Sequence, residues 1–272
     1  MDISEAADHV KDLRHFHFPA GKHWDLPTFS IFGHQVHVTE YMVLELLVAV
    51  ALILVFVPLA RRTADGRPVR GRWANFFETM LVFLRDEVAR PAIGRHDADR
   101  FLPFIWTVFF FVLFCNLAGA IPWSGSPTGA LAVTGVLAGM TFLTVIVSGM
   151  TKFGAVGFWT GMVPHMDVPW AMAIVLKPML MVLEIAGLLI RHAVLAVRLL
   201  ANMFAGHMVF AVVVSFITAT AGGLFVLWVG VTLGSLAGAA ALSLLELFVA
   251  FLQAYIFAFL SALFIGMAVH QH

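Results

Sequence analysis

Long apolar runs separated by short polar segments are the main pattern along this chain. Residues 41–60, 101–121 and 130–150 are each apolar over about 20 positions and carry few charges. A helix that rises 1.5 Å per residue needs about 20 residues to cross a hydrocarbon core of about 30 Å. The pattern therefore predicts three membrane-spanning helices in the first 150 residues.

Two much longer apolar runs follow, at residues 171–221 and 224–269. Each would measure about 70 Å as a straight helix, more than twice what the hydrocarbon requires. The sequence shows no turn chemistry between positions 188 and 205, so two upright spans within the first run are not indicated. We expect two long, strongly tilted helices, packed antiparallel through a turn at Gly222 and Gly223.

A shorter stretch at about residues 73–93 has helical periodicity on one face only. Its apolar positions recur every three or four residues: Trp73, Phe76, Phe77, Met80, Leu81, Leu84 and Val88. This spacing is typical of an amphipathic helix that lies on the membrane interface. The predicted fold class is all-α integral membrane, with about five crossing helices and one interfacial helix.

The segments outside these helices are polar. Residues 1–39 contain six histidines, which are His9, His15, His17, His23, His34 and His37. No spacing among them matches a defined ligand set, so we interpret this segment as an external or interfacial arm. We expect residues 40–272 to form a single transmembrane domain, in which residues 151–169 are a cytoplasmic connection that contains glycine and proline.

Composition and charge narrow the function classes. Apolar residues make up 61% of the chain and charged residues 12%, against about a quarter charged in soluble domains. The net charge of zero gives no support for a nucleic-acid partner. Phosphate-binding loops are absent from the sequence, so any ATP chemistry must occur elsewhere, and we expect no cofactor and no metal. The single cysteine, Cys115, cannot form an internal disulfide.

Charge also predicts the orientation in the membrane. The first span is followed by five arginines within twelve residues: Arg61, Arg62, Arg67, Arg70 and Arg72. Cytoplasmic loops carry such an excess of positive charge. We therefore expect the N-terminus outside and the C-terminus in the cytoplasm. The first 38 residues show no cleavable signal, so the first span is expected to direct its own insertion.

Polar residues recur at seven-residue intervals in the two long runs. The first run carries Lys177, Glu184, Arg191 and Arg198, and the second carries Glu246 and Gln253. Seven residues is nearly two helical turns, so each set follows one slowly drifting stripe. Such groups are costly in lipid. The pattern indicates an ion path, with a buried structural network between the two helices as the alternative.

The side chains differ in what they can do in such a path. Arginine keeps its proton at every physiological pH, so Arg198 can act only as a fixed positive charge. Glu246 and His207 can take up and release protons once their surroundings shift their pKa. Asn202 and Gln253 can hold and orient water but do not titrate.

Three segments of the chain resemble one family. The segment 196–207, with Arg198, Asn202 and Gly206 at intervals of four, resembles the arginine-containing helix of subunit a of rotary F-type ATP synthases. The run 245–257 is similar to that family's last helix, and the stretch from Asn116 to Pro122 matches the end of its second span. The resemblance covers about residues 40 to 270.

The resemblance implies a stator subunit of an ion-driven rotary motor. The host membrane is that of a bacterium or an organelle, and the arginine-rich loop and the polar arm favour a bacterial inner membrane. The resemblance also implies that this chain is not itself catalytic, and that its partners are a ring of c subunits, peripheral-stalk b subunits and the lipid bilayer. Each c subunit would carry a carboxylate past Arg198, between two offset half-channels for protons. The implied path residues are Arg198, Asn202, His207, Glu246, Gln253, Glu184 and Asn116. Some family members have the acid and the imidazole of His207 and Glu246 exchanged.

Two other functions remain as alternatives. A stand-alone secondary ion transporter usually has internal repeats and broken helices, and no convincing repeat is visible in the sequence. An intramembrane metalloenzyme would need histidine and acid ligands on facing helices. The nearest candidate pairs, His15/His17 and His34/His37, fall in the arm outside the spans.

Overall fold

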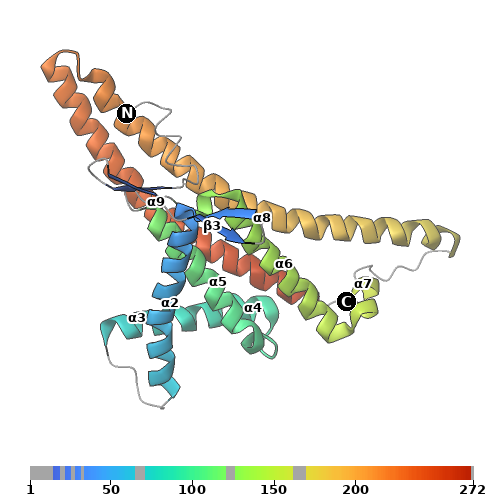
Figure 1. The fold of residues 1–272 in the computed structure, drawn as a ribbon. Coiled ribbons are helices and arrows are strands. Elements are labelled where there is room, and N and C mark those ends of the chain that lie inside the picture. Colours follow the sequence, from blue (N-terminus) through green and yellow to red (C-terminus); the bar gives the residue numbers. More distant parts are fainter. Residues whose placement is uncertain are drawn as a thin grey trace. The chain divides into compact units, whose positions relative to one another are not determined.

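The helices of this chain account for all of its predicted spans. The computed structural model describes residues 15–18, 22–25, 28–31, 34–64, 71–120, 126–161 and 170–270. Five helices within these ranges are long and apolar enough to cross a membrane: α2 (Glu40–Ala64), α5 (Ala98–Gly119), α6 (Leu131–Phe153), α8 (Trp170–Thr220) and α9 (Phe225–Val269) (Figure 1). The predicted all-α integral membrane fold with five crossing helices is confirmed.

The last two helices have the predicted length, with 51 residues in α8 and 45 in α9. A short turn at residues 221–223 joins them, where the amide of Gly223 donates to the carbonyl of Thr220 at 3.0 Å. Beyond the turn the two helices run antiparallel, because Gly238 of α9 lies against Val213 of α8. Their tilt in the bilayer stays a prediction.

The predicted interfacial helix is helical over its whole length, but it changes type midway. It consists of α3 (Arg72–Phe83), a π-helical turn η1 (Leu84–Ala89) and α4 (Arg90–Ile93). The indole of Trp106 on α5 donates to the carbonyl of Leu81 at 3.1 Å, just before the helix type changes. Trp73 is 79% exposed whereas Leu84 and Val88 are buried, so only the second half of the apolar face packs on protein.

The connecting segment after α6 contains a helix that the sequence analysis did not predict. The connection expected at residues 151–169 contains a short helix, α7 (Ala155–Gly161), and residues 162–169 lie outside the described part. Gly154 ends α6 with a φ of +77°, which favours glycine. Phe158 of α7 is then buried against Gly149, where a side chain would overlap its ring. This contact explains why the segment is helical despite its glycines.

The N-terminal arm contains β-structure that the sequence analysis did not predict. Strands β1 (His15–Phe18) and β2 (Lys22–Asp25) form one antiparallel pair, and β3 (Thr28–Ile31) and β4 (His34–His37) form another. The register sets His17 opposite His23 and Thr28 opposite His37. The external position of the arm stays a prediction.

The chain divides into two compact units. Unit 1 consists of Met1–Arg67, Phe110–Thr134 and Arg198–Ala254, and unit 2 of Pro68–Phe109, Gly135–Val197 and Tyr255–His272. In unit 1, the rings of Phe56 on α2 and Phe110 on α5 pack with their centroids 4.5 Å apart. The division into an arm at 1–39 and one transmembrane domain at 40–272 stays a prediction.

Unit 2 is held together by close helix contacts and by one ion-pair cluster. Gly266 of α9 lies directly against the backbone of Ala92 and 3.3 Å from the Cα of Ile93, measured from an added Cβ. At the end of α6, the Lys152 ammonium donates to the Asp97 carboxylate at 2.7 Å. The His270 imidazole lies 3.6 Å from the same oxygen, so Asp97 joins three segments.

The contact at Gly266 predicts that any side chain there displaces the end of the interfacial helix. We expect Gly266→Ala to destabilise the chain by about 1–3 kcal/mol, because the added methyl group meets backbone that cannot rotate away. The measurement is the thermal melting of the purified complex. Gly234→Ala is the matched control on α9, since nothing lies within 4 Å of an added Cβ there. Equal melting of both variants would contradict the contact.

The Asp97 cluster predicts a dependence of stability on pH. The hydrogen bond from Lys152 lowers the pKa of the Asp97 carboxyl below its ordinary value. Ionised Asp97 therefore stabilises the fold above its unfolded-state pKa, and this contribution is lost as the pH falls through the folded-state pKa. Between about pH 5 and about pH 2, the melting temperature of Asp97→Asn should fall less than that of the unmodified chain. Asp99→Asn changes a more exposed carboxyl, so its melting temperature should fall as much as that of the unmodified chain.

Candidate functional site

Most of the predicted site residues lie on α8 and α9 within unit 1. Asn116 lies on α5, and both ends of its side-chain amide are hydrogen-bonded. Its side chain is fully buried. Its amide nitrogen donates to the carbonyl of Ala250 on α9 at 3.2 Å, and its amide oxygen accepts from the Thr128 hydroxyl at 2.7 Å. The Ser126 hydroxyl lies 3.0 Å from that of Thr128. Asn116 thus fixes α9 to α5 and to the turn before α6.

A second amide links the two long helices directly. The Asn202 side chain on α8 donates from Nδ2 to Oε1 of Gln253 on α9 at 2.7 Å. Gln253 is 2% exposed, and its Nε2 has no hydrogen-bond partner among the described residues. A buried donor without a partner is costly. Oε1 of Gln253 is therefore hydrogen-bonded, whereas its Nε2 is available to water or to another polar group.

Glu246 occupies a notch in the surface of α8. A Cβ added at Gly206 would lie 2.6 Å from its carboxylate oxygen Oε1, so the acid reaches the backbone of α8 where no side chain stands. This oxygen is buried and lacks a hydrogen-bond donor in the described part of the chain. Such an atom needs a proton, a water molecule or a further donor. His207 follows Gly206, and its side chain lies outside the described residues.

Arg198 has a different environment, because its side chain is exposed. It lies one turn before Asn202 on α8, whereas the next residue, Leu199, is fully buried. No ion pair joins Arg198 to a carboxylate within the ranges that the structure describes. Arg198 therefore stands on the outer face of the helix pair.

Glu184 is the predicted site residue that the structure does not bring to this group. It is half-buried and belongs to unit 2, fourteen residues before Arg198 on the same helix. Its relation to Arg198 therefore remains a spacing along α8.

Several polar residues with defined partners were not found by sequence reasoning. Thr128 bonds to Asn116 and Ser126 bonds to Thr128, yet the sequence around Pro127 indicates only a turn. His192 of unit 2 is buried between the rings of Phe142 and Phe264, at centroid distances of 5.3 and 4.9 Å. Its Nδ1 bonds to the carbonyl of Leu188 at 2.8 Å. No sequence signal distinguishes it from an exposed histidine.

An intramembrane metalloenzyme would need several ligating side chains close together. Across the described side chains, no group of three or more His, Cys, Asp or Glu residues is placed to hold a metal ion. The side chains of His15, His17 and His34, which supplied the candidate pairs, lie outside this part of the chain.

Five candidate spans and a row of partly satisfied polar groups between two long helices define a polytopic membrane protein suited to passing ions. Comparison with known proteins gives the family. The family model described as ATP synthase A chain matches residues 42–266. The chain belongs to this family, which makes it a multi-pass membrane component of the CF(0) sector that transports protons in ATP synthesis.

Individual relatives agree over nearly the whole chain. ATP synthase subunit a of Myxococcus xanthus is 36% identical over 97% of this chain and 88% of its own length. ATP synthase subunit a 2 of Chlorobaculum tepidum is 36% identical over 96% of this chain and 71% of its own. ATP synthase subunit a of Chloroherpeton thalassium is 37% identical over 97% and 76%.

The notch at Gly206 predicts a direct effect on proton transport. We expect Gly206→Ala to reduce ATP-driven proton pumping by about tenfold, because the new methyl group displaces the Glu246 carboxylate. The measurement is acidification of membrane vesicles that carry the assembled complex. Gly230→Ala, at a position of α9 with open space, should pump normally.

A compensating change makes this test specific. Glu246→Asp shortens the acid and should restore part of the pumping in the Gly206→Ala background. If the double variant pumps no better than Gly206→Ala alone, the contact is not the cause of the defect.

Proposed function

We propose that this chain is the non-catalytic stator subunit that provides two proton half-channels and an essential arginine, Arg198, facing a rotating ring of c subunits. The observation that carries the proposal is an exposed guanidinium on an apolar helix surface without a carboxylate among the described residues. Arginine at the centre of a span is costly unless it meets water or an opposite charge. Because no carboxylate within the described residues supplies this charge, we assign it to another chain.

The small number of acidic residues in the two long helices supports a partner subunit that carries its own carboxylate. The two long helices contain only Glu184 and Glu246 as carboxylates, and both are fixed on the stator. Glu246 lies against Gly206, eight residues beyond Arg198, which is about 12 Å along the helix. An acid that travels past Arg198 is therefore expected on the c ring. Next to the guanidinium such an acid would be held ionised until it moves on.

The polar groups beyond Arg198 form the first half-channel in this proposal. Asn202 and Gln253 make a hydrogen bond there, and the free end of Gln253 can hold water. The unsatisfied oxygen of Glu246 can receive and release a proton. His207 would complete this path, and Asn116 would keep α9 in register with α5.

The second half-channel is assigned to the opposite side of Arg198. Glu184 precedes Arg198 by fourteen residues, which is about 21 Å along α8. The two entrances are thus offset on either side of a charge that cannot give up its proton. A membrane potential of 100 mV is worth about 2.3 kcal/mol per charge, and this energy turns the ring only if the path is interrupted at Arg198.

The surroundings follow from the same proposal. The arginines after α2 favour a cytoplasmic loop, which puts the N-terminus outside and the C-terminus inside a bacterial inner membrane. The outward faces of α8 would meet the c ring. Peripheral-stalk b subunits and lipid would cover other helices.

Replacement of Arg198 tests the central role. We expect Arg198→Ala to abolish ATP-driven proton pumping in the assembled complex, because the two half-channels would then be joined without a barrier. Arg72→Gln is the control, since it removes a cation from the interfacial helix and leaves α8 intact. Pumping by Arg198→Ala at the control level would disprove the proposal.

Crosslinking checks the partner independently of activity. Val197→Cys stands on the exposed face beside Arg198, while Leu199→Cys is buried in the helix pair. The first should crosslink to a small acid-bearing membrane subunit and the second should not. A complex in which neither position reaches such a subunit would count against a ring at this face.

A further inference from the structure

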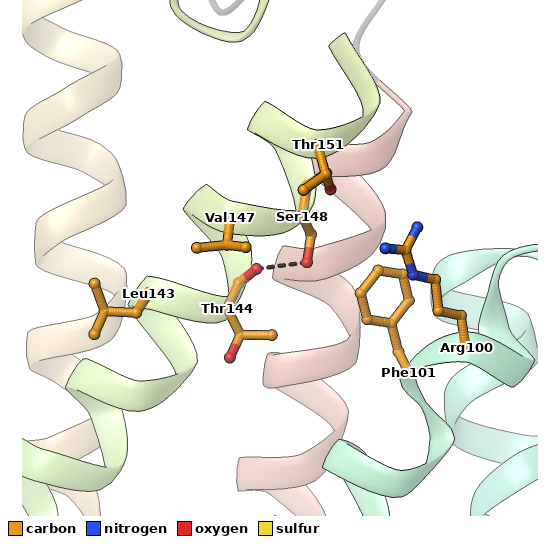
Figure 2. A pocket seen from close by; sticks show the side chains of 7 residues that line it. All are labelled: Arg100, Phe101, Leu143, Thr144, Val147, Ser148 and Thr151. Carbon is orange, nitrogen blue, oxygen red and sulfur yellow. Dashed lines mark hydrogen bonds between the residues drawn. The ribbon is translucent and has the colours of Figure 1, made fainter. Parts of the chain in front are cut away.

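A pocket in unit 2 lies at the ends of two spans, away from the residues assigned to the proton path. It has a volume of about 320 Å³ and is lined by Arg100, Phe101, Leu143, Thr144, Val147, Ser148 and Thr151. Figure 2 shows Arg100 and Phe101 approaching from α5 and the other five residues from α6. Its volume is at the lower end of the range for small-molecule sites.

The position along the helices sets the depth of this pocket. Arg100 is in the first turn of α5 and Thr151 is near the end of α6, so the polar end of the pocket lies where the spans leave the hydrocarbon. Leu143 is eight residues before Thr151, about 12 Å deeper along the helix. Leu143 and Val147 are 59% and 56% exposed, so the deeper wall opens toward lipid. The pocket is thus polar at headgroup level and apolar at acyl-chain level.

Arg100 is the cation of this site. The nearby cations are already paired, Arg90 with Asp86 at 2.8 Å and Lys152 with Asp97 at 2.7 Å. Arg100 has no ion pair with any carboxylate in the described ranges. Its guanidinium lies 6.0 Å from the centroid of the Phe101 ring. A planar guanidinium with free donors matches the oxygens of a phosphate group.

The hydroxyl groups on α6 present the opposite chemistry. Thr144 donates its hydrogen to the carbonyl of Met140 at 2.8 Å, and Thr151 donates to that of Ser148 at 2.9 Å. Ser148 likewise donates to the carbonyl of Thr144, as the dashed line in Figure 2 shows. Each hydroxyl has only one hydrogen, so the oxygens are left as acceptors. This wall favours a donor, such as an ammonium group.

We propose that this pocket binds one phosphatidylethanolamine molecule. Its phosphate lies at Arg100, its ammonium group donates to the hydroxyl oxygens of Ser148 and Thr151, which are one helical turn apart, and its acyl chains run along Leu143 and Val147. Phosphatidylcholine has the same phosphate but no N–H donor, so it is the informative competitor. The assignment depends on the chain spanning a membrane and not on the proton path.

The experiment uses the assembled complex in nanodiscs of equal parts phosphatidylethanolamine, phosphatidylglycerol and phosphatidylcholine. The lipids that remain on the subunit after transfer to detergent are identified by native mass spectrometry. We expect one retained phosphatidylethanolamine per chain, enriched about fivefold over the other lipids. Arg100→Gln should lower the retention about fivefold, whereas Arg95→Gln, an exposed cation outside the pocket, should leave it unchanged.

Two further variants separate the headgroup from the acyl chains. Ser148→Ala with Thr151→Val removes the acceptors and should abolish the preference over phosphatidylcholine while a lipid is still retained. Val147→Trp should fill the pocket and displace the lipid, whereas Leu131→Trp, at an exposed position in the first turn of α6, should not. Thermal melting equal to that of the unmodified complex shows that each variant is folded.

Three results would overturn the assignment. The first is equal retention in the Arg100→Gln and Arg95→Gln complexes. The second is phosphatidylcholine or phosphatidylglycerol retained as well as phosphatidylethanolamine. The third is a crosslink from Val147→Cys to another subunit in high yield, which would identify a protein segment as the occupant. None of these results bears on proton pumping through Arg198, so the two proposals fail separately.

Discussion

The hydrogen bond between Asn202 and Gln253 shows the constraint on which the rest of this structure depends. Hydrocarbon offers no partner to a polar group, so each such group inside a span must be satisfied by the protein, by water or by another chain. The 2.7 Å bond joins α8 to α9 at the level of the predicted path. The two bonds of Asn116 then fix α5 to α9 and to the turn before α6. These contacts position the helices on which every other candidate residue stands.

The same constraint gives meaning to the polar atoms that the described residues leave unsatisfied. Nε2 of Gln253 and Oε1 of Glu246 are buried without partners among the described residues, although both ends of the Asn116 amide on α5 are hydrogen-bonded. Arg198 carries its charge on an exposed apolar face. Leaving such groups unpaired is costly, and natural structures do so mainly where water, protons or a partner must enter. Their concentration on one helix pair supports the proposed path over a purely structural network.

Small residues let the helices approach closely enough for these contacts. Helix association in membranes relies on packing and on small residues at the interface, because lipid is as apolar as leucine. Gly266 brings α9 against the backbone of α4, and Gly149 receives the ring of Phe158. Gly206 serves the candidate site in the same way, since it makes room for a carboxylate. One structural device therefore supports both the fold and the chemistry.

Local chemistry was sufficient to predict much of this protein. Hydropathy and length predicted the five spans, one-sided periodicity predicted the interfacial helix, and seven-residue spacing singled out Arg198, Glu246 and Gln253. These signals are readable because each depends on residues within a few turns of one another. The strands of the arm, α7 and the π turn at Leu84–Ala89 were missed, since contacts such as that of Phe158 with Gly149 override local preference.

The partners of the polar side chains were decided by tertiary structure alone. Asn116 and Ala250 are 134 positions apart, and Asn202 and Gln253 are 51 apart, so no periodicity relates them. The packing of distant helices decides three further features. It decides which end of Gln253 is hydrogen-bonded and how Glu246 reaches Gly206. It also brings Arg100 and the hydroxyls of α6 to one pocket. The sequence by itself thus determined which groups enter the membrane, because insertion of a segment depends on its own length and hydropathy. Their pairing required the fold, because a hydrogen bond depends on two atoms reaching the same place.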